Sequence, residues 1–113
     1  MKKHKGDDKM AGGMANMQQM MRKMQKMQQE MESEQKNIET KEFQGTEPSG
    51  MVNVTVTGDR RVKAINIKPD AVDPEDVDML QDLLIEAVNN GLEKVDTETA
   101  NVMGKYTKGI PGL

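Results

Sequence analysis

Basic side chains are the residues of this chain whose types and spacing best fit a binding function. Arg22, Lys23 and Lys26 form a cluster, and residues 22 and 26 share one face of a helix because they are four apart. Such a cluster could hold the phosphate backbone of a nucleic acid. A solvated surface is the simpler interpretation of each basic residue by itself, but dimerisation would double every patch. The other basic residues considered are Lys2, Lys3, Lys5, Lys9, Arg60, Arg61, Lys63, Lys105 and Lys108.

Residues suited to catalysis or metal binding are scarce. The chain has no cysteine and one histidine, His4, and it contains no nucleophile-elbow, zinc-protease or phosphate-loop motif. His4 with Asp7 and Asp8 is better explained as a solvated segment among lysines than as a metal site. The acidic residues around Asp73 lack the spacing, the central glycine and the terminal glutamate of a calcium loop. We therefore expect no catalysis, no cofactor, no metal ion and no small-molecule substrate.

Composition narrows the class of protein further. The 113 residues carry a net charge of −3 at pH 7, with a mean hydropathy of −0.79, and this length suits one small domain. A chain of this charge needs local clusters of positive charge to bind DNA. No apolar run approaches the length of a membrane span, and the basic N-terminus lacks the apolar segment of a secretory signal. We expect a cytoplasmic protein without membrane contact.

Methionine is concentrated in the first third of the chain. Part of it recurs every seven residues, which predicts a long helix with an apolar stripe. We expect this helix over residues 13–36, about 36 Å long at the usual rise per residue. The remainder of the chain could cover only part of such a stripe, so a second copy is its simplest partner. The repeating positions are Met10, Met17, Met24, Met31 and Ile38, joined by Met14, Met20, Met21 and Met27.

The middle of the chain predicts a small antiparallel sheet. Residues 51–57 alternate between valine and polar residues after Met51, which is typical of a strand with one buried face. Residues 38–46 predict a weaker edge strand. Gly58–Asp59 predicts a two-residue hairpin turn into a partner strand over residues 61–68. Alternation in that last strand is imperfect, which indicates a bulge or a sheet covered on both faces.

A second helix is predicted after the strands. Asp73 fits the N-cap and Pro74 the first helical position. An apolar stripe then continues to about Met103, and Gly104 is the predicted C-terminal stop. The residues expected to pack in the core or the dimer are Met24, Met27, Met31, Val52, Val54, Val56, Ile65, Ile67, Leu80 and Leu84.

Four of these segments together resemble the YbaB/EbfC family of bacterial nucleoid-associated DNA-binding proteins. They read MANMQQMMRKMQKMQQEM, FQGTEPSGMVNVTVTG, VDPEDVDMLQDLLIEAVN and MGKYTKGIPGL. The resemblance covers most of the chain, from about Met14 to its end. It implies an α-β-β-β-α protomer of the α+β class, a tight homodimer with tweezer-like helical arms, DNA binding, nucleoid localisation and no catalysis. By position, Arg22, Lys23 and Lys26 match the first-helix basic residues of the family.

The sequence therefore predicts a nucleoid-associated homodimer that binds double-stranded DNA mainly through phosphates, with modest sequence preference. The alternative is an adaptor protein that grips a partner helix with an exposed, methionine-rich helix face. We divide the chain into a flexible basic arm (1–12), a dimerisation and DNA-binding domain (13–104) and a flexible tail (105–113). The predicted DNA-binding residues are Arg22, Lys23, Lys26, Lys9, Lys105 and Lys108.

Overall fold

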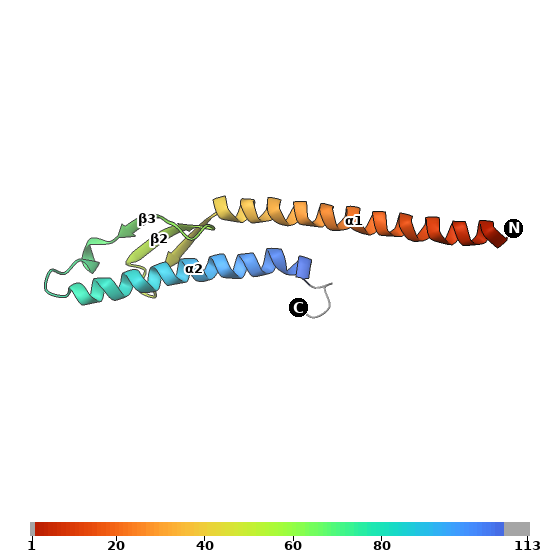
Figure 1. The fold of residues 1–113 in the computed structure, drawn as a ribbon. Coiled ribbons are helices and arrows are strands. Elements are labelled where there is room, and N and C mark those ends of the chain that lie inside the picture. Colours follow the sequence, from red (N-terminus) through yellow and green to blue (C-terminus); the bar gives the residue numbers. More distant parts are fainter. Residues whose placement is uncertain (1, 108–113) are drawn as a thin grey trace. The chain divides into compact units, whose positions relative to one another are not determined.

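The elements of the chain follow the predicted α-β-β-β-α order of an α+β protein. The computed structural model describes the backbone of residues 2–107 and the side chains of residues 13–107. The chain divides into two compact units, residues 1–33 and 34–113, and the first helix begins in one and ends in the other. The elements are α1 (Lys2–Thr40), β1 (Glu42–Thr46), β2 (Val52–Thr57), β3 (Val62–Ile67), the 3-10 helix η1 (Pro69–Ala71) and α2 (Val77–Thr107) (Figure 1).

Helix α1 starts earlier than the predicted helix over residues 13–36. The backbone is helical from Lys2, so the predicted arm over residues 1–12 is not separated from the helix by a break. Gly12 and Gly13 each disfavour a helix by about 1 kcal/mol relative to alanine. The lysine, methionine, glutamine and alanine residues around them are good helix formers and outweigh this. The flexibility of the arm stays a prediction.

The same helix also ends later than predicted. Ile38, expected at the start of the first strand, is still helical and is buried. The helix ends at Thr40, whose hydroxyl lies 3.2 Å from the carbonyl oxygen of Asn37. The backbone N–H of Lys41 donates to the carbonyl of Ile38 at 3.0 Å, which tightens the last turn. Burial of Ile38 is a tertiary effect that its local sequence does not reveal.

The three strands form one antiparallel sheet in the order β1-β2-β3. β2 is the central strand, and β1 is an edge strand, as predicted. The register between β2 and β3 shifts between Thr55 and Val56, which is the irregularity that the imperfect alternation indicated. Val56 therefore pairs with Val62, whereas Val54 pairs with Ile65.

The connection between β2 and β3 differs from the predicted two-residue turn. Thr57 donates to the carbonyl of Arg61 at 2.8 Å, so three residues, 58–60, form the loop. The positive φ of 65° falls at Arg60 rather than at Gly58. A three-residue loop ending in a left-handed residue is a common hairpin geometry. Gly58 is needed for another reason: a Cβ there would lie 1.7 Å from the carbonyl oxygen of Ile38.

The core lies between one face of β2 and helix α2. Val52, Val54 and Val56 are fully buried, and Ala87 and Val95 of α2 pack against them. Leu80 and Leu84, expected in this core, lie partly buried at its margin. Gly45 of β1 and Gly91 of α2 allow the closest approach of strand and helix. A Cβ on Gly45 would lie 2.2 Å from the carbonyl oxygen of Ala87.

β3 departs from the predicted core. Ile65 and Ile67 were expected to be buried, yet they are 46% and 38% exposed. They pair across the sheet with Val54 and Val52, and residues opposite each other in an antiparallel pair share a face. The difference arises because α2 packs chiefly against β1 and β2. The β3 third of the core-facing sheet surface is therefore apolar and uncovered in the single chain.

Helix α2 begins and ends later than predicted. Asp76, not Asp73, caps it, because the N–H of Met79 donates to the Asp76 carboxylate at 3.1 Å. The Asp73 carboxylate instead accepts the N–H of Glu75 at 2.9 Å in the preceding turn. The helix continues through Gly104, the predicted stop, to Thr107.

Candidate nucleic-acid interface

The basic cluster lies on one side of α1, away from the methionine stripe. Arg22, Lys23 and Lys26 are exposed. Met17 and Lys26 are nine residues apart, about two and a half helical turns, so they point to opposite sides of the helix. Arg22 lies one turn before Lys26 and shares its side. Helix α1 therefore presents two separate faces, one cationic and one apolar.

The cationic face is not neutralised by neighbouring carboxylates. Within residues 13–107, none of Arg22, Lys23 and Lys26 takes part in an ion pair. Three ammonium or guanidinium groups within about 6 Å of helix rise form a compact patch of positive charge. Such a patch can neutralise successive phosphates of a nucleic acid backbone.

The methionine stripe is exposed from Met14 to Met24. Met14, Met17, Met20, Met21 and Met24 are 59–65% exposed, so Met24 does not pack in the core of the single chain. Met27 and Met31, also expected to pack, are partly covered.

Charge is unevenly divided along the chain. Residues 1–33 contain seven lysines and arginines against four acidic residues, a net charge of +3. Residues 34–113 contain nine lysines and arginines against fifteen acidic residues, a net charge of −6. The outward positions Asp78, Asp82 and Glu86 of α2 are exposed and follow each other at helical spacing. The positive charge of the chain is therefore concentrated in residues 1–33 and the negative charge in residues 34–113.

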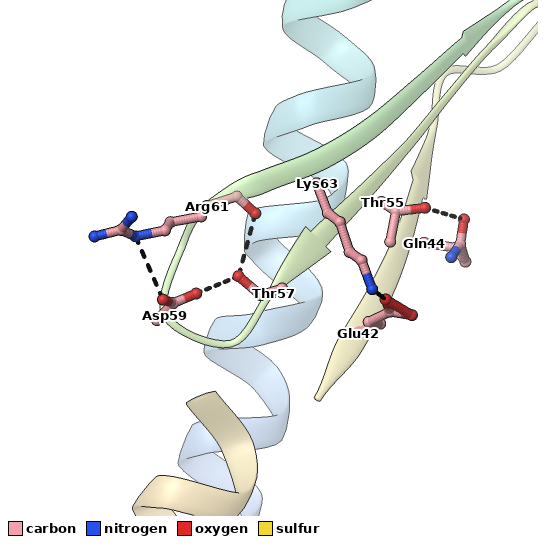
Figure 2. A network of polar contacts seen from close by, with 7 residues as sticks. All are labelled: Glu42, Gln44, Thr55, Thr57, Asp59, Arg61 and Lys63. Atoms are coloured by element: carbon pink, nitrogen blue, oxygen red, sulfur yellow. Dashed lines mark hydrogen bonds and ion pairs between the residues drawn. The ribbon is translucent and has the colours of Figure 1, made fainter. Parts of the chain in front are cut away.

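Several basic residues outside α1 are held in ion pairs. Lys63 of β3 pairs with Glu42 across the sheet, and Arg61 pairs with Asp59 at 3.4 Å (Figure 2). Figure 2 also shows the polar face of the sheet, where the Thr55 hydroxyl donates to Gln44 at 3.2 Å. Two further pairs join the sheet region to α2, namely Arg60 with Asp96 and Lys41 with Glu98. These pairs lower the positive charge that the sheet offers to a phosphate.

Lys105, a predicted DNA-binding residue, also has a partner. Its ammonium lies 2.6 Å from the carboxylate of Glu34. This bond, with a smaller contribution from Tyr106, lowers the pKa of Glu34, while Glu34 raises the pKa of Lys105. Burial, followed by Glu34, raises the pKa of Tyr106. Both members of the ion pair are thus charged at neutral pH and largely cancel each other.

The remaining predicted contacts fall outside the structural description. The side chain of Lys9 and the whole of Lys108 lie outside the described residues. The structure thus brings together Arg22, Lys23 and Lys26 and adds no second predicted contact to them. Within the described residues, no cluster of three potential metal ligands occurs, and no helix is long and apolar enough to cross a membrane.

One feature of the surface was missed by reasoning from sequence. Besides the apolar residues of β3, Val77 and Ile85 of α2 are 52% and 58% exposed. Ile85 lies on the same flank of α2 as Asp96, eleven residues later, whose carboxylate pairs with Arg60 of the β2–β3 loop. The sequence did contain an indication of this exposed apolar surface, because Ile85 lies off the main apolar stripe of the helix.

Comparison with known proteins places this fold and these faces in a family. A nucleoid-associated protein of Pediococcus pentosaceus is 56% identical over 104 residues, which are 92% of this chain and 100% of that protein. Nucleoid-associated proteins of Enterococcus faecalis and Lacticaseibacillus casei are 55% and 58% identical, over 92% and 87% of this chain and 100% and 99% of theirs.

A solved structure shares the fold. The crystal structure of the uncharacterized protein HP0035 from Helicobacter pylori matches with a TM-score of 0.61 at 20% identity, over 74% of this chain and 87% of that one. The model of the YbaB/EbfC DNA-binding family matches residues 14–110. The match includes the cationic face of α1, the whole sheet and α2, and the chain belongs to the YbaB/EbfC DNA-binding family.

Proposed function

We propose that this protein binds double-stranded DNA as a homodimer, mainly through phosphate contacts, and that it acts in the bacterial nucleoid of the cytoplasm. The observation that carries the proposal is the exposed, unpaired cluster of Arg22, Lys23 and Lys26 in a segment of net positive charge. The names of the relatives, nucleoid-associated proteins, support the location. The family is defined by DNA binding rather than by a reaction, which agrees with a protein that is not an enzyme.

Phosphate contacts give the proposal a quantitative form. If the three basic residues of both protomers each neutralise one phosphate, the slope of log K against log salt approaches about −5. Base reading should be modest, because the chain has no tryptophan, one tyrosine and one phenylalanine and no evident recognition motif. Any sequence preference would then arise from the shape and stiffness of the DNA.

The uncovered apolar surface supports the homodimer. Val62, Ile65 and Ile67 of β3 are between 38% and 47% exposed, and Val77 and Ile85 of α2 are also exposed. β3 is also an edge strand, with one side of its backbone free to meet another chain. A second copy related by a two-fold axis would present the same surface in return. Burial of both surfaces would complete the core that α2 leaves open.

Charge reversal tests the DNA contacts. We would measure fluorescence anisotropy of a labelled random-sequence duplex across a salt series, for the natural chain and for K23E/K26E. Binding should be lost, with the dimer still folded. The matched control is K36E/K68E, which changes the net charge equally at two exposed lysines outside the cluster. Retained low-salt affinity in K23E/K26E, or an equal loss in the control, would refute the assignment to the basic cluster.

Sedimentation tests the homodimer. Ile65→Glu introduces a charge on the uncovered apolar surface and should yield monomers at micromolar concentration. Asn66→Glu, the next residue on the same strand, points to the opposite, polar face, and should remain a dimer. A monomeric natural chain, or a dimeric Ile65→Glu variant, would contradict the proposed surface.

A protein-interaction adaptor is the second candidate. The exposure of Met14, Met17, Met20, Met21 and Met24 favours it, since flexible methionines suit the capture of a partner helix. An adaptor would bind its partner in a salt-tolerant way, and polar substitutions of Met14 and Met21 would abolish that binding. DNA binding would be salt-sensitive and would respond to charge reversal instead.

A further inference from the structure

Helix α1 contains a stretch, residues 13–26, without side-chain burial. Every residue from Gly13 to Lys26 is exposed. Its helicity in the single chain therefore depends on the intrinsic preferences of its residues rather than on packing. Methionine ranks among the good helix formers, and five of these fourteen residues are methionines. A chemical change at those five side chains therefore acts on the helix itself.

We infer that the exposed methionines of α1, which are Met14, Met17, Met20, Met21 and Met24, form an oxidation site that controls the order of the cationic face. Conversion of these thioethers to sulfoxides would destabilise the helix and disperse the basic cluster. The effect on DNA affinity rests on the proposed function, whereas the effect on helicity does not.

The chemistry requires a two-electron oxidant such as hydrogen peroxide. The thioether sulfur attacks one peroxide oxygen, an S–O bond forms and the O–O bond breaks. Proton transfer then gives methionine sulfoxide and one water molecule. The sulfur is oxidised and the peroxide is reduced. Thiol-dependent methionine sulfoxide reductases reverse this change, so the site could be reset without new synthesis of the protein.

The structure links these methionines to the basic cluster through the backbone. Met20, Met21 and Met24 flank Arg22 and Lys23 in the sequence, although they occupy a different side of the helix. In a helix, Arg22 and Lys26 are separated by about 6 Å along the axis and share one side. In an extended chain the same residues would be about 13 Å apart. A polar, bulkier sulfoxide on the opposite side therefore acts on the cluster by loosening the turns that align it.

Exposure decides which methionines react first. Met14, Met17, Met20, Met21 and Met24 are about 60% exposed, whereas Met27 and Met31 are partly covered. Susceptibility to oxidation follows exposure. Graded peroxide treatment should therefore modify the first group before the second, which peptide mass spectrometry can measure directly.

The experiment compares reduced, oxidised and repaired protein. Helicity is followed by far-ultraviolet circular dichroism, and affinity by anisotropy of a labelled duplex at one salt concentration. Oxidation should lower helicity and weaken DNA binding by about tenfold, because an unfolded segment must then be ordered on binding. Treatment with methionine sulfoxide reductases should restore both signals.

Two variants separate the stripe from the other methionines. M14L/M17L/M20L/M21L/M24L keeps good helix formers at all five positions but cannot be oxidised there, and should keep its helicity and affinity after peroxide. M27L/M31L, a control at the partly covered positions, should respond to peroxide as the natural chain does. If the five-leucine variant aggregates, M20L/M21L/M24L serves the same purpose and should show a reduced response.

The outcomes are distinct. Unchanged helicity and affinity with all five sulfoxides formed would overturn the inference. If the reduced protein does not bind DNA, the proposed function is overturned, and so is the inferred effect of oxidation on DNA affinity. The inferred effect of oxidation on helicity is then decided by circular dichroism alone. If peroxide lowers the DNA affinity of the five-leucine variant as much as that of the natural chain, the effect arises from other residues and the inference is overturned.

Discussion

The approach of β1 to α2 at Gly45 gives the sharpest test of the fold. A Cβ at this position would lie 2.2 Å from the carbonyl oxygen of Ala87 and 2.6 Å from the backbone nitrogen of Gly91. Both are backbone atoms of a helix, so no side-chain rotation relieves the contact. Gly45→Ala must push α2 away from the sheet by about 1 Å before the contact becomes ordinary. The helix then loses its fit to Val54 and Val56, which are fully buried.

The magnitude follows from the kind of clash. Overpacking a core by a methyl group costs about 1–3 kcal/mol, and occasionally more. We expect about 3 kcal/mol for Gly45→Ala because the clash involves two rigid backbone segments. Domains of this size are stable by about 5–15 kcal/mol, so a large share would be lost. The melting temperature should fall by about 12 °C or more.

Two other glycines provide matched controls in the same fold. A Cβ on Gly91 would meet a side-chain carbon of Val56 at 3.0 Å, so Gly91→Ala should destabilise much less than Gly45→Ala. A Cβ on Gly104 meets nothing within 4 Å, and Gly104→Ala should stabilise α2 by about 0.5–1 kcal/mol. Urea unfolding followed by circular dichroism, at one protein concentration, measures all three. A Gly45→Ala midpoint equal to that of the natural chain would refute the argument.

Two further predictions concern single polar groups. Glu47 is buried at 3% exposure, and its carboxylate accepts the N–H of Met51 at 2.6 Å and the hydroxyl of Ser49 at 2.6 Å. The hydrogen bond from Ser49, followed by those from backbone N–H groups, lowers the pKa of Glu47, whereas burial opposes this shift. Because its pKa is lower in the folded state, Glu47 contributes stability at pH values above its unfolded pKa near 4.5, and this stability is lost as the pH falls through the folded pKa. The urea midpoint of Glu47→Gln should therefore fall less between pH 5 and pH 3, a window around the reference pKa, than that of the natural chain. Parallel plots of urea midpoint against pH for the two proteins would contradict this. Asp76→Ala should lose about 1 kcal/mol through the N-cap of α2, whereas Asp73→Ala should lose less, and equal unfolding midpoints for the two variants would show that Asp76 is not the cap.

The alternation of residues 51–57 predicted β2 correctly, because α2 covers the face that carries Val52, Val54 and Val56. The same reasoning identified which residues of β3 share a face, since Ile65 and Ile67 do lie opposite buried valines. It did not predict their exposure, because alternation indicates a shared face and not whether a helix reaches it. That depends on the position of α2 over β1 and β2.

The ends of α2 show a second limit of local patterns. Asp73 and Asp76 both meet the local requirements of an N-cap, and Pro74 fits after the first of them. The choice of Asp76 depends on the turn that Asp73 makes with Glu75. Gly104 resembles a stop signal, yet the helix continues because Tyr106 is buried and Lys105 is paired with Glu34. Both contacts join residues distant in sequence.

The candidate site was predictable where it depends on one helix and not where it depends on the tertiary fold. Arg22, Lys23 and Lys26 could be recognised from spacing alone, because four residues make one turn. The pairing of Lys105 with Glu34 and of Lys63 with Glu42 could not. Charges that look equal in the sequence are therefore unequal in the structure: Lys63 and Lys105 have carboxylate partners, whereas Arg22, Lys23 and Lys26 have none among residues 13–107.

This unequal distribution bears on how DNA would approach the protein. A net charge of −6 over residues 34–113 repels phosphates within about a Debye length, about 8 Å at physiological salt. The cationic face of α1 attracts them over the same range. An encounter from the side of the sheet or of α2 is therefore disfavoured, and DNA should meet the protein at α1 first. A homodimer doubles both the attraction and the repulsion, so its preference for α1 is stronger than that of one protomer.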